Sequence, residues 1–201
     1  MRLSVENLAG ERDGRRIFSG VDFQLGEGQS LIVSGPNGAG KSTLLRILAG
    51  LLPSAEGLVR IDGWEPPSVA AACHYLGHLN AMKAVLTVTE NLRFWRQFLG
   101  DKLLSTEDAL SRVGLDGIAH LPFGYLSTGQ QRRASIARLL TCRRPLWLLD
   151  EPTAGLDTSS QLQVSALMRD HLESGGMIVA ATHLPLDLPG ATELHLRAAF
   201  A

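Results

Sequence analysis

One stretch of the sequence has the residue types and the spacing needed to wrap around a phosphate chain. It is rich in glycine, follows an apolar run, precedes an apolar helical pattern and fits GxxxxGK[ST]. The glycines let the backbone turn tightly so that its N–H groups point inward, while the lysine can reach the β- and γ-phosphates and the serine can ligate Mg²⁺. This predicted phosphate-binding loop consists of Gly35, Pro36, Asn37, Gly38, Ala39, Gly40, Lys41, Ser42 and Thr43.

A second stretch, Leu146 to Glu151, places two acids directly after four apolar residues. The apolar run is typical of a buried strand, and Asp150 at its end can hold the water shell of Mg²⁺. Glu151, one residue on, can orient and polarise an attacking water. A strand that happens to end in two acids is the alternative, and the phosphate loop upstream disfavours it. These two stretches alone are compatible with kinases, GTPases and many ATPases.

The run Leu126 to Arg133 narrows the class of protein. It reads LSTGQQRR, and Ser127 with the backbone of Gly129 opens a predicted helix, whose N-terminus favours anions. The run resembles the LSGGQ signature of ATP-binding cassette (ABC) proteins, with Thr128 in place of the first glycine of that motif. Two further stretches follow in the order typical of that family, one similar to its D-loop and one to its switch histidine: Ala154-Gly155-Leu156-Asp157 and Thr182-His183.

The resemblance implies an α/β fold, the ABC-type nucleotide-binding domain of the P-loop NTPases, which hydrolyses ATP with Mg²⁺ as cofactor. It also implies that Ser127, Gly129 and Gln130 grip the γ-phosphate of ATP bound to a second copy of the chain. The two copies would then enclose ATP between them. Glu151 orients the attacking water and His183 contacts the γ-phosphate, so these two are the expected catalytic residues.

Two positions depart from the general ABC pattern. Where most members stack an aromatic ring on adenine, this chain has Arg12, whose flat guanidinium can also stack on a base. Where they carry the Q-loop glutamine, it has His78, which we expect to help position Mg²⁺ and water, a purely structural role being the alternative. The expected nucleotide site therefore includes Arg12, and the expected metal site consists of Ser42, Asp150 and His78.

Less general stretches resemble one branch of the ABC family. They are Glu11 to Asp13, Phe18 to Gly20 and, above all, His74 to Trp95. They are similar to the ATP-binding subunits of cytochrome c biogenesis complexes, which have been labelled haem exporters. This resemblance implies an integral membrane subunit of CcmB type as partner and CcmC-like and CcmE-like proteins reached through the complex. It also implies a peripheral location at the cytoplasmic face of the bacterial inner membrane.

Three other functions are compatible with some of these residues. An ABC ATPase that serves a different cargo has the same general motifs. A soluble ABC protein acting on DNA or ribosomes usually carries two cassettes or a long coiled-coil insertion, and 201 residues hold neither. A nucleotide sensor without hydrolysis is the third, and Glu151 and His183 argue against it.

Short apolar runs alternate with helical patterns along the chain, which predicts a largely parallel sheet covered on both faces. We expect strands at 31–33, 58–61, 146–149 and 177–180, and helices at 42–49, 90–99, 130–140 and 159–173. The whole chain, 1–201, is predicted to be one ABC ATPase domain. Its catalytic core would comprise about 1–74 and 141–201, with an inserted helical subdomain at about 75–140.

The composition limits the partners. The 19 basic and 20 acidic residues give a formal charge of −1, so the chain has no net positive charge that would favour binding to nucleic acid. The apolar runs fall short of the roughly 20 residues that cross a bilayer, and the polar N-terminus does not fit a signal peptide, so we expect any membrane work to require docking onto another chain. Five arginines are expected on a solvated helix face: Arg132, Arg133, Arg138, Arg143 and Arg144.

The segment His78 to Trp95 is the predicted docking surface for the membrane subunit, because this is where the sequence most resembles a single branch. An apolar groove with a charged rim is expected there. Phe94 and Trp95 are expected to pack their helix against the core, an aromatic patch that faces the partner being the alternative. Cys73 and Cys142 have no CxxC spacing and are expected to be plain small apolar residues. The expected groove is lined by Leu79, Met82, Val85, Leu86 and Leu92, with Lys83, Glu90 and Arg93 at its rim.

Overall fold

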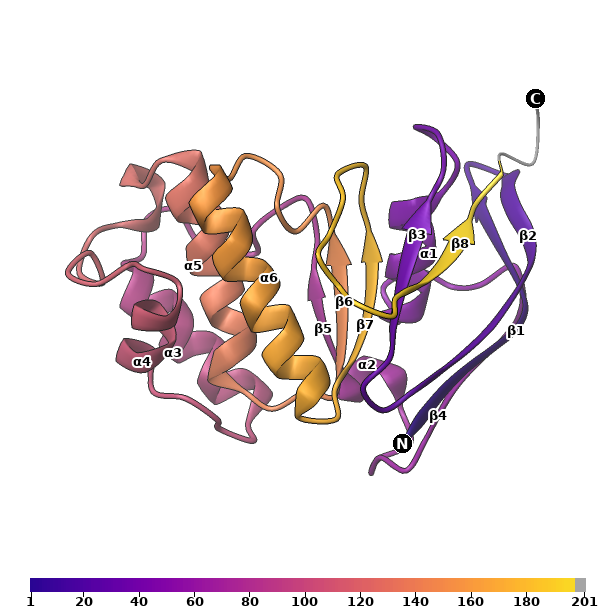
Figure 1. The fold of residues 1–201 in the computed structure, drawn as a ribbon, viewed down its shortest axis with the longest axis horizontal. Coiled ribbons are helices and arrows are strands. Elements are labelled where there is room, and N and C mark those ends of the chain that lie inside the picture. The colour runs from indigo at the N-terminus through magenta and orange to yellow at the C-terminus, as the bar shows by residue number, and fades with distance from the viewer. Residues whose placement is uncertain (198–201) are drawn as a thin grey trace. The chain divides into compact units, whose positions relative to one another are not determined.

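The computed structural model describes residues 1–197 (Figure 1), and the chain forms two compact units. The larger unit contains residues 1–77, 144–151 and the chain from 168 onward. The second unit contains residues 78–143 and 152–167. The chain therefore leaves the larger unit twice, and the second excursion, 152–167, lies outside the helical subdomain expected at about 75–140.

A parallel sheet forms the centre of the larger unit. Its strands follow the order β5-β6-β7-β3-β8, and every neighbouring pair is parallel. β6 and β7 are buried along their whole length, which explains their uninterrupted apolar sequences. The strands are β3 (Ser30–Ser34), β5 (Cys73–Leu76), β6 (Leu146–Asp150), β7 (Met177–Ala181) and β8 (Thr192–His195).

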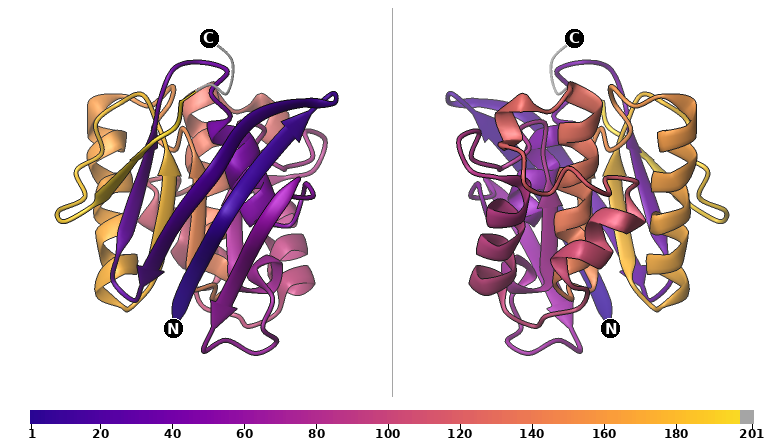
Figure 2. Two further views of the ribbon diagram at one scale, coloured as in Figure 1. Left: turned by 90° about the vertical axis from the view of Figure 1, so that its right-hand side faces the viewer. Right: turned by 90° about the vertical axis from the view of Figure 1, so that its left-hand side faces the viewer.

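An antiparallel sheet of the order β2-β1-β4 completes the larger unit; its three strands run side by side in the left view of Figure 2. They are β1 (Arg2–Arg12), β2 (Arg15–Gly26) and β4 (Glu56–Asp62). Asp13 and Gly14 join β1 to β2 with φ angles of 52° and 72°. Two consecutive positive φ angles match the twist of a tight hairpin, and Asp-Gly is a sequence that favours it. The hairpin holds Arg12 next to the turn.

Helix α1 (Lys41–Leu48) follows β3 and packs against β6 and β7. Its Leu44, Leu45 and Leu48 are buried in the same apolar core as Leu31 and Val179 of the parallel sheet. The short helix α2 (Val69–Ala72) begins at Ser68, whose hydroxyl accepts a hydrogen bond from the Ala71 amide. This core fixes the start of α1, where the predicted phosphate loop ends.

The second unit is helical in the residues that the structure describes, and its helices appear together in the right view of Figure 2. Capping boxes start α3 and α5, with Thr87 paired to Glu90 and Ser127 paired to Gln130. Both α3 and α4 pack against α5. The elements are α3 (Val88–Leu99), α4 (Thr106–Arg112), η1 (Phe123–Tyr125), α5 (Thr128–Thr141) and the first part of α6 (Thr158–Glu173).

The α/β fold with a parallel sheet is confirmed and all four expected strands are present, although two details differ from the sequence expectations. The strand expected at 58–61 exists as β4 and lies in the antiparallel sheet. Its alternating burial fits a sheet with one face in the core. Residues 75 and 76, expected at the start of the helical subdomain, belong to β5 and pair with Leu148 and Leu149 of β6.

The expectation that the arginine cluster forms a solvated helix face is wrong for two of its members. Arg132 and Arg138 are each only 5% exposed. The Arg132 Nε atom donates to the carbonyl oxygen of Pro152 at 3.3 Å, and the Arg138 guanidinium lies 4.6 Å above the ring of Trp95. These contacts lie inside the second unit, so the two arginines support its packing.

Two expectations for the docking segment are also wrong. Leu92 is fully buried in the second unit and does not line a groove. Phe94, expected in the helix core, is 55% exposed, and its ring stacks on that of Phe98 with centroids 5.9 Å apart. Cys73 and Cys142 are buried and not bonded to each other, as expected of small apolar residues. Within residues 1–197, no helix combines the length and the hydropathy needed to cross a membrane.

His171 supports the larger unit near the start of β6. Its ring stacks on Trp147 with centroids 4.0 Å apart and an interplanar angle of 10°. Its Nε2 atom lies 3.2 Å from the carbonyl oxygen of Pro145. Burial lowers the pKa of His171 from 6.5 to about 4, because the charged imidazolium is poorly solvated there. The folded chain therefore resists a proton that the unfolded chain binds.

We predict that the unfolding free energy is fully retained above pH 6.5 and falls as the pH drops from 6.5 toward 4. The expected loss at pH 5 is about 2 kcal/mol, since one pKa unit corresponds to about 1.4 kcal/mol. Urea unfolding at pH 7 and pH 5 measures it. His171→Phe keeps a flat ring on Trp147 without a titrating group, so the variant should lose less stability over that interval. Equal losses in both proteins would contradict the assignment to His171.

Candidate active site

The predicted phosphate loop runs from the end of β3 to the start of α1. Gly35, Gly38 and Gly40 have φ angles of 134°, 84° and 99°, a region that residues with a side chain rarely adopt. A Cβ atom on Gly40 would lie 2.7 Å from the Ile17 side chain and 2.9 Å from that of Phe18. Glycine is therefore required at position 40 by both the backbone angle and the space.

Lys41 is the first residue of α1 and is 8% exposed. Its Nζ atom donates to the carbonyl oxygens of Gly35 at 2.7 Å and Pro36 at 3.2 Å, so the ammonium lies across the inside of the loop. The N-cap residue of α1 is Gly40, and no side chain caps the helix there. The first amides of α1 thus have no side-chain acceptor and, together with the ammonium, suit an anion.

The two acids lie at the end of β6, which is separated from β3 by β7 in the parallel sheet. Asp150 ends β6 and is 5% exposed. Glu151 has a φ angle of +49°, a left-handed conformation that costs about 1–2 kcal/mol for a residue with a side chain. Its amide donates to the Ala181 carbonyl oxygen at 2.8 Å, which holds the backbone in this conformation. The chain thus turns sharply between the two acids.

Thr182 and His183 converge on Glu151 from the end of β7. The Thr182 hydroxyl and the His183 amide each lie 3.4 Å from Glu151 Oε2, and His183 Nε2 lies 3.8 Å from Oε1. The Thr182 hydroxyl also accepts a hydrogen bond from the Leu184 amide at 2.9 Å. Sequence reasoning anticipated His183 but gave Thr182 no role. Its position, a hydroxyl residue between an apolar strand and a polar histidine, was the available signal.

The register of the parallel sheet brings these groups to one edge. Val33 of β3 pairs with Ala181 of β7, and Ala181 pairs with Asp150 of β6. The phosphate loop, the acids and the Thr182-His183 pair all follow this row, so they meet where the strands' carboxyl ends lie. Such an edge is the usual ligand site of a parallel α/β sheet.

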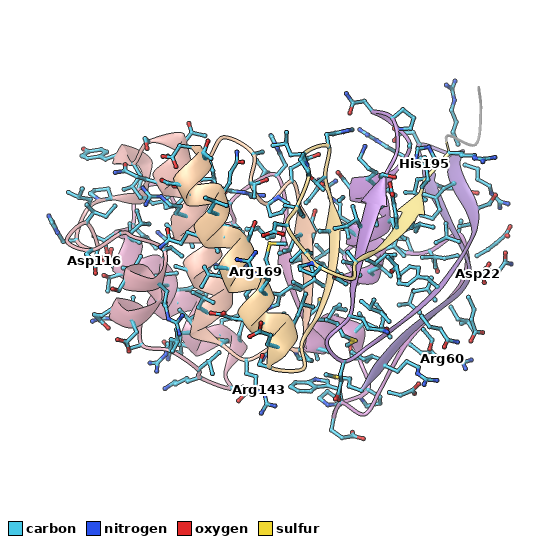
Figure 3. The ribbon with its side chains drawn as sticks, in the orientation of Figure 1. Asp22, Arg60, Asp116, Arg143, Arg169 and His195 are labelled. Carbon is cyan, nitrogen blue, oxygen red and sulfur yellow. The ribbon has the colours of Figure 1, made fainter. Side chains whose placement is uncertain are left out.

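Residues at the end of β8 contact Ser34, the residue that precedes the phosphate loop (Figure 3). His195, labelled there at the end of β8, has its Nδ1 atom 3.1 Å from the hydroxyl of Ser34. The Leu196 amide donates to the Ser34 carbonyl oxygen at 2.9 Å. The Leu196 carbonyl oxygen also occupies the space that a side chain at Gly35 would need. Gly35, the first residue of the loop, is therefore restricted to glycine by the lack of space as well as by its backbone angle.

Arg12 borders a hollow beside α1 in the larger unit. The hollow has a volume of about 490 Å³ and is also lined by Thr43, so it adjoins the end of the phosphate loop. The Arg12 side chain is exposed and its Nε atom lies 3.6 Å from Asp13. The complete lining is Glu11, Arg12, Asp13, Thr43, Arg46, Leu52, Pro53, Ser54 and Ala55.

The remaining expected site residues lie in the second unit. The Ser127 hydroxyl accepts a hydrogen bond from the Gln130 amide at 3.3 Å, and the Gln130 side chain accepts one from the Ser127 amide at 2.9 Å. A Cβ atom on Gly129 would lie 3.4 Å from the Gly155 carbonyl oxygen, so the signature and the D-loop stretch are neighbours. His78 starts this unit with an exposed side chain.

Asp157 anchors the D-loop stretch to the start of α6. Its carboxylate accepts a hydrogen bond from the Ser160 amide at 2.7 Å and another from the Ser159 hydroxyl at 2.9 Å. These bonds favour the charged form, so the Ser160 amide above all lowers the pKa of Asp157. The stretch that adjoins the signature is therefore held in place by its own carboxylate.

Comparison with known proteins shows which protein family shares this sequence and fold. A family model described as "ABC transporter" matches residues 18–154. A putative ATP-binding ABC transporter protein from Pyrococcus furiosus has the same fold, with a TM-score of 0.84 at 22% identity over 98% of each chain. An ATP-binding cassette solved as a dimer in a post-hydrolysis state, bound to ADP and Pi, has a TM-score of 0.82 at 25% identity, covering 97% of this chain and 94% of the other.

The chain therefore belongs to the ABC transporter family, and family membership implies nucleotide binding. Among curated relatives it is 63% identical to a protein from Chelativorans sp. over 98% of this chain and 99% of the relative. It is 64% identical to one from Mesorhizobium japonicum over 95% of this chain and 96% of the relative. Both relatives are named cytochrome c biogenesis ATP-binding export protein CcmA.

We predict that Thr182→Val lowers the turnover number for ATP about tenfold and leaves the KM for ATP nearly unchanged. The reason is that valine keeps the shape of threonine but removes the hydroxyl beside Glu151 Oε2. This loss is a fraction of the hundredfold or more that a positioned base contributes. Steady-state hydrolysis measures it, and Thr182→Ser should restore most of the rate. A valine variant as fast as the unmodified protein would show that the hydroxyl does not position Glu151.

Proposed function

We propose that this chain is the ATP-hydrolysing subunit of a membrane complex for c-type cytochrome biogenesis. The observation that supports hydrolysis most directly is the strained turn at Glu151, which aims a carboxylate at Thr182 and His183 beside the phosphate loop. The identity of 63–64% to proteins named CcmA over nearly the whole chain supports the biological role. The proposed role includes export of haem or release of a haem chaperone.

The proposed mechanism assigns the phosphates of ATP to the loop amides, Lys41 and Ser42. The Lys41 ammonium now bonded to two loop carbonyls is positioned to turn toward the β- and γ-phosphates. Glu151 accepts a hydrogen bond from the attacking water and draws its proton, while His183 contacts the γ-phosphate. Because phosphoryl transfer needs little covalent help, this positioning supplies most of the rate. Loss of the γ-phosphate then weakens the contacts that hold the closed form.

The residues at the sheet edge fit a Mg²⁺ ion held chiefly by phosphates. Within residues 1–197, no three His, Cys, Asp or Glu side chains gather as a metal site. Mg²⁺ commonly takes only one or two protein groups beside phosphates and water, and the buried Asp150 carboxylate with the Ser42 hydroxyl meets that need. His78 is a proposed further contributor. The bound ion would neutralise charge that develops on the phosphates.

A second copy is proposed to complete each nucleotide site. Ser127 and Gly129 lie at the start of α5, a helix of 14 residues whose N-terminus favours a phosphate. A related cassette is a dimer in a structure that holds ADP and Pi. We therefore place Ser127, Gly129 and Gln130 of one copy against the γ-phosphate held by the other, in a two-fold dimer.

We predict that Glu151→Gln binds ATP, forms a stable dimer and loses ATP hydrolysis by a factor of a hundred or more. Glutamine keeps the size of the side chain but accepts no proton, so the closed form accumulates. Light scattering after size-exclusion chromatography measures the mass with ATP and with ADP. A monomer at every ATP concentration would contradict the composite site, and near-normal hydrolysis would contradict the role of Glu151.

The docking surface for the membrane subunit is proposed to be an apolar patch of Leu79, Val85, Phe94 and Phe98. These side chains are between 55% and 86% exposed, although all are large and apolar. Phe94 also lines a hollow of about 410 Å³ in the second unit, which suits a short helix of the integral membrane subunit. The hollow is lined by Ala81, Met82, Lys83, Leu86, Asn91, Phe94 and Trp95.

The hollow is held in shape by a buried polar side chain. Asn91 donates to the carbonyl oxygens of Lys83 and Thr87, each at 3.0 Å, and accepts from the Lys83 amide at 2.7 Å. The Trp95 indole donates to the Ala81 carbonyl oxygen at 2.9 Å. The loop and α3 are thus joined before any partner arrives, which reduces the entropy lost on binding. The exposed Lys83 and Arg93 favour acidic groups on the partner.

We predict that replacing both Phe94 and Phe98 with serine weakens association with the membrane subunit at least tenfold, since exposed aromatic rings commonly dominate a protein interface. Co-purification from membranes containing a CcmB-type subunit measures it. The matched control is Leu103→Ser, which removes an apolar side chain of similar exposure, 57%, outside the patch. Normal co-purification of the double variant would place the docking surface elsewhere. This docking would make the chain peripheral to the membrane, and we propose that it lies at the cytoplasmic face.

A further inference from the structure

Tyr125 has no role in the proposed ATP site, yet it is the most exposed aromatic side chain near the signature. Its relative exposure is 83%. It ends η1 and lies two residues before Ser127, the N-cap of α5. Two residues span about 7 Å at most, so the Tyr125 Cα lies within that distance of the Ser127 Cα, and the side chain extends further from there. The ring itself is uncharged and does not suit a phosphate.

The turn that carries Tyr125 is fixed on both sides. The Phe123 amide donates to the Leu86 carbonyl oxygen at 2.8 Å, and the Gly124 amide donates to that of Ala84 at 2.9 Å. The Gln131 side chain donates to the Leu126 carbonyl oxygen at 3.1 Å. Phe123 is buried and anchors the turn. The Tyr125 ring is therefore presented to solvent by a backbone with little freedom, as a preformed binding surface would be.

Within residues 1–197, no aromatic ring borders the hollow of the larger unit that would receive a base. The hollow beside the phosphate loop is bordered by Arg12, and no Phe, Tyr or Trp is among the residues that line it. The Arg12 side chain is exposed, so one face of a base lying against it would remain open to water. A flat aromatic surface stacks on any base and shields it from water. Such a surface has to come from outside this hollow.

We propose that the Tyr125 ring of one copy stacks on the base of the ATP held by the other copy, which encloses the base between this ring and Arg12. The inference rests on the proposed dimer, in which Ser127 of the same turn meets the same nucleotide. Tyr125 is then a base-binding residue that acts only in the closed dimer. Formation of the closed dimer then depends on the base of the nucleotide as well as on its γ-phosphate.

The first test measures stacking directly, in full-length chains that all carry Glu151→Gln. The probe is the triphosphate of 2-aminopurine riboside, whose fluorescence falls when an aromatic ring stacks on it. At saturating probe the dimer with Tyr125 should be quenched and the Tyr125→Ala dimer should be brighter. Leu103→Ala, a loss of exposed apolar surface elsewhere in the second unit, should be quenched like the parent. Equal brightness of the Tyr125→Ala and parent dimers would overturn the proposal.

The affinity of closure gives a second readout. Tyr125→Ala should raise the ATP concentration that half-saturates dimer formation about tenfold, within the range for loss of one base–aromatic stack. Tyr125→Phe keeps the ring and should restore most of the affinity. Recovery by leucine to the same degree as by phenylalanine would indicate a protein–protein contact instead and would overturn the proposal. If no chain dimerises with ATP, the composite site itself fails, which is a separate result.

Mixed pairs decide which copy supplies the ring. One pair joins a Lys41→Ala copy to a Tyr125→Ala copy, so that the only bound probe meets an intact Tyr125 from the opposite chain. The other pair joins a chain carrying both substitutions to an unsubstituted one, so that the probe meets alanine. The pairs contain the same substitutions and differ only in arrangement. The first should be quenched and the second should not; the reverse order would place the ring in the probe's own chain.

Discussion

Val33, Ala181 and Asp150 stand in one row across β3, β7 and β6, and the groups proposed for phosphate chemistry in the larger unit are attached to the chain just after that row. A parallel sheet gives adjacent strands the same direction, so three separate segments end together. A shift of one residue in any pair would turn the side chains to the opposite face. Because β6 and β7 are buried on both faces, close packing of their side chains, rather than an alternation of polar and apolar residues, has to hold this register.

In the second unit, the start of α5 is held rigid by its own contacts while it stays accessible. Ser127 and Gln130 satisfy each other's backbone donors, and Arg132 fastens the first turn of α5 to Pro152 from inside. Arginine suits this place because its planar guanidinium presents several N–H donors in a fixed geometry. The stretch that follows Glu151 is thus attached to the signature helix by a contact that contains neither catalytic residue.

The loop at 35–43 and the acids at 150–151 were predictable because phosphate chemistry restricts which residues can occupy those positions. The parallel strands followed from unbroken apolar runs. Burial of Arg132 and Arg138 was not predictable, since their partners are a carbonyl oxygen at Pro152 and a ring at Trp95 that sequence spacing does not bring near. The exposure of Phe94 was missed for a related reason. Helical spacing indicates which side chains share one face of a helix, but it does not indicate whether another element covers that face.

The position of β3 between β7 and β8 has a consequence for how the chain is made. The phosphate loop is synthesised early, yet the strand before it gains its neighbours only when residues 177–181 and 192–195 have left the ribosome. Until then β3 has two open edges, and Ser34 lacks the backbone partner that Leu196 supplies. Pairing between distant segments is slow, and open edges invite aggregation. Both edges of β3 therefore stay open for pairing until nearly all of the described chain has been synthesised.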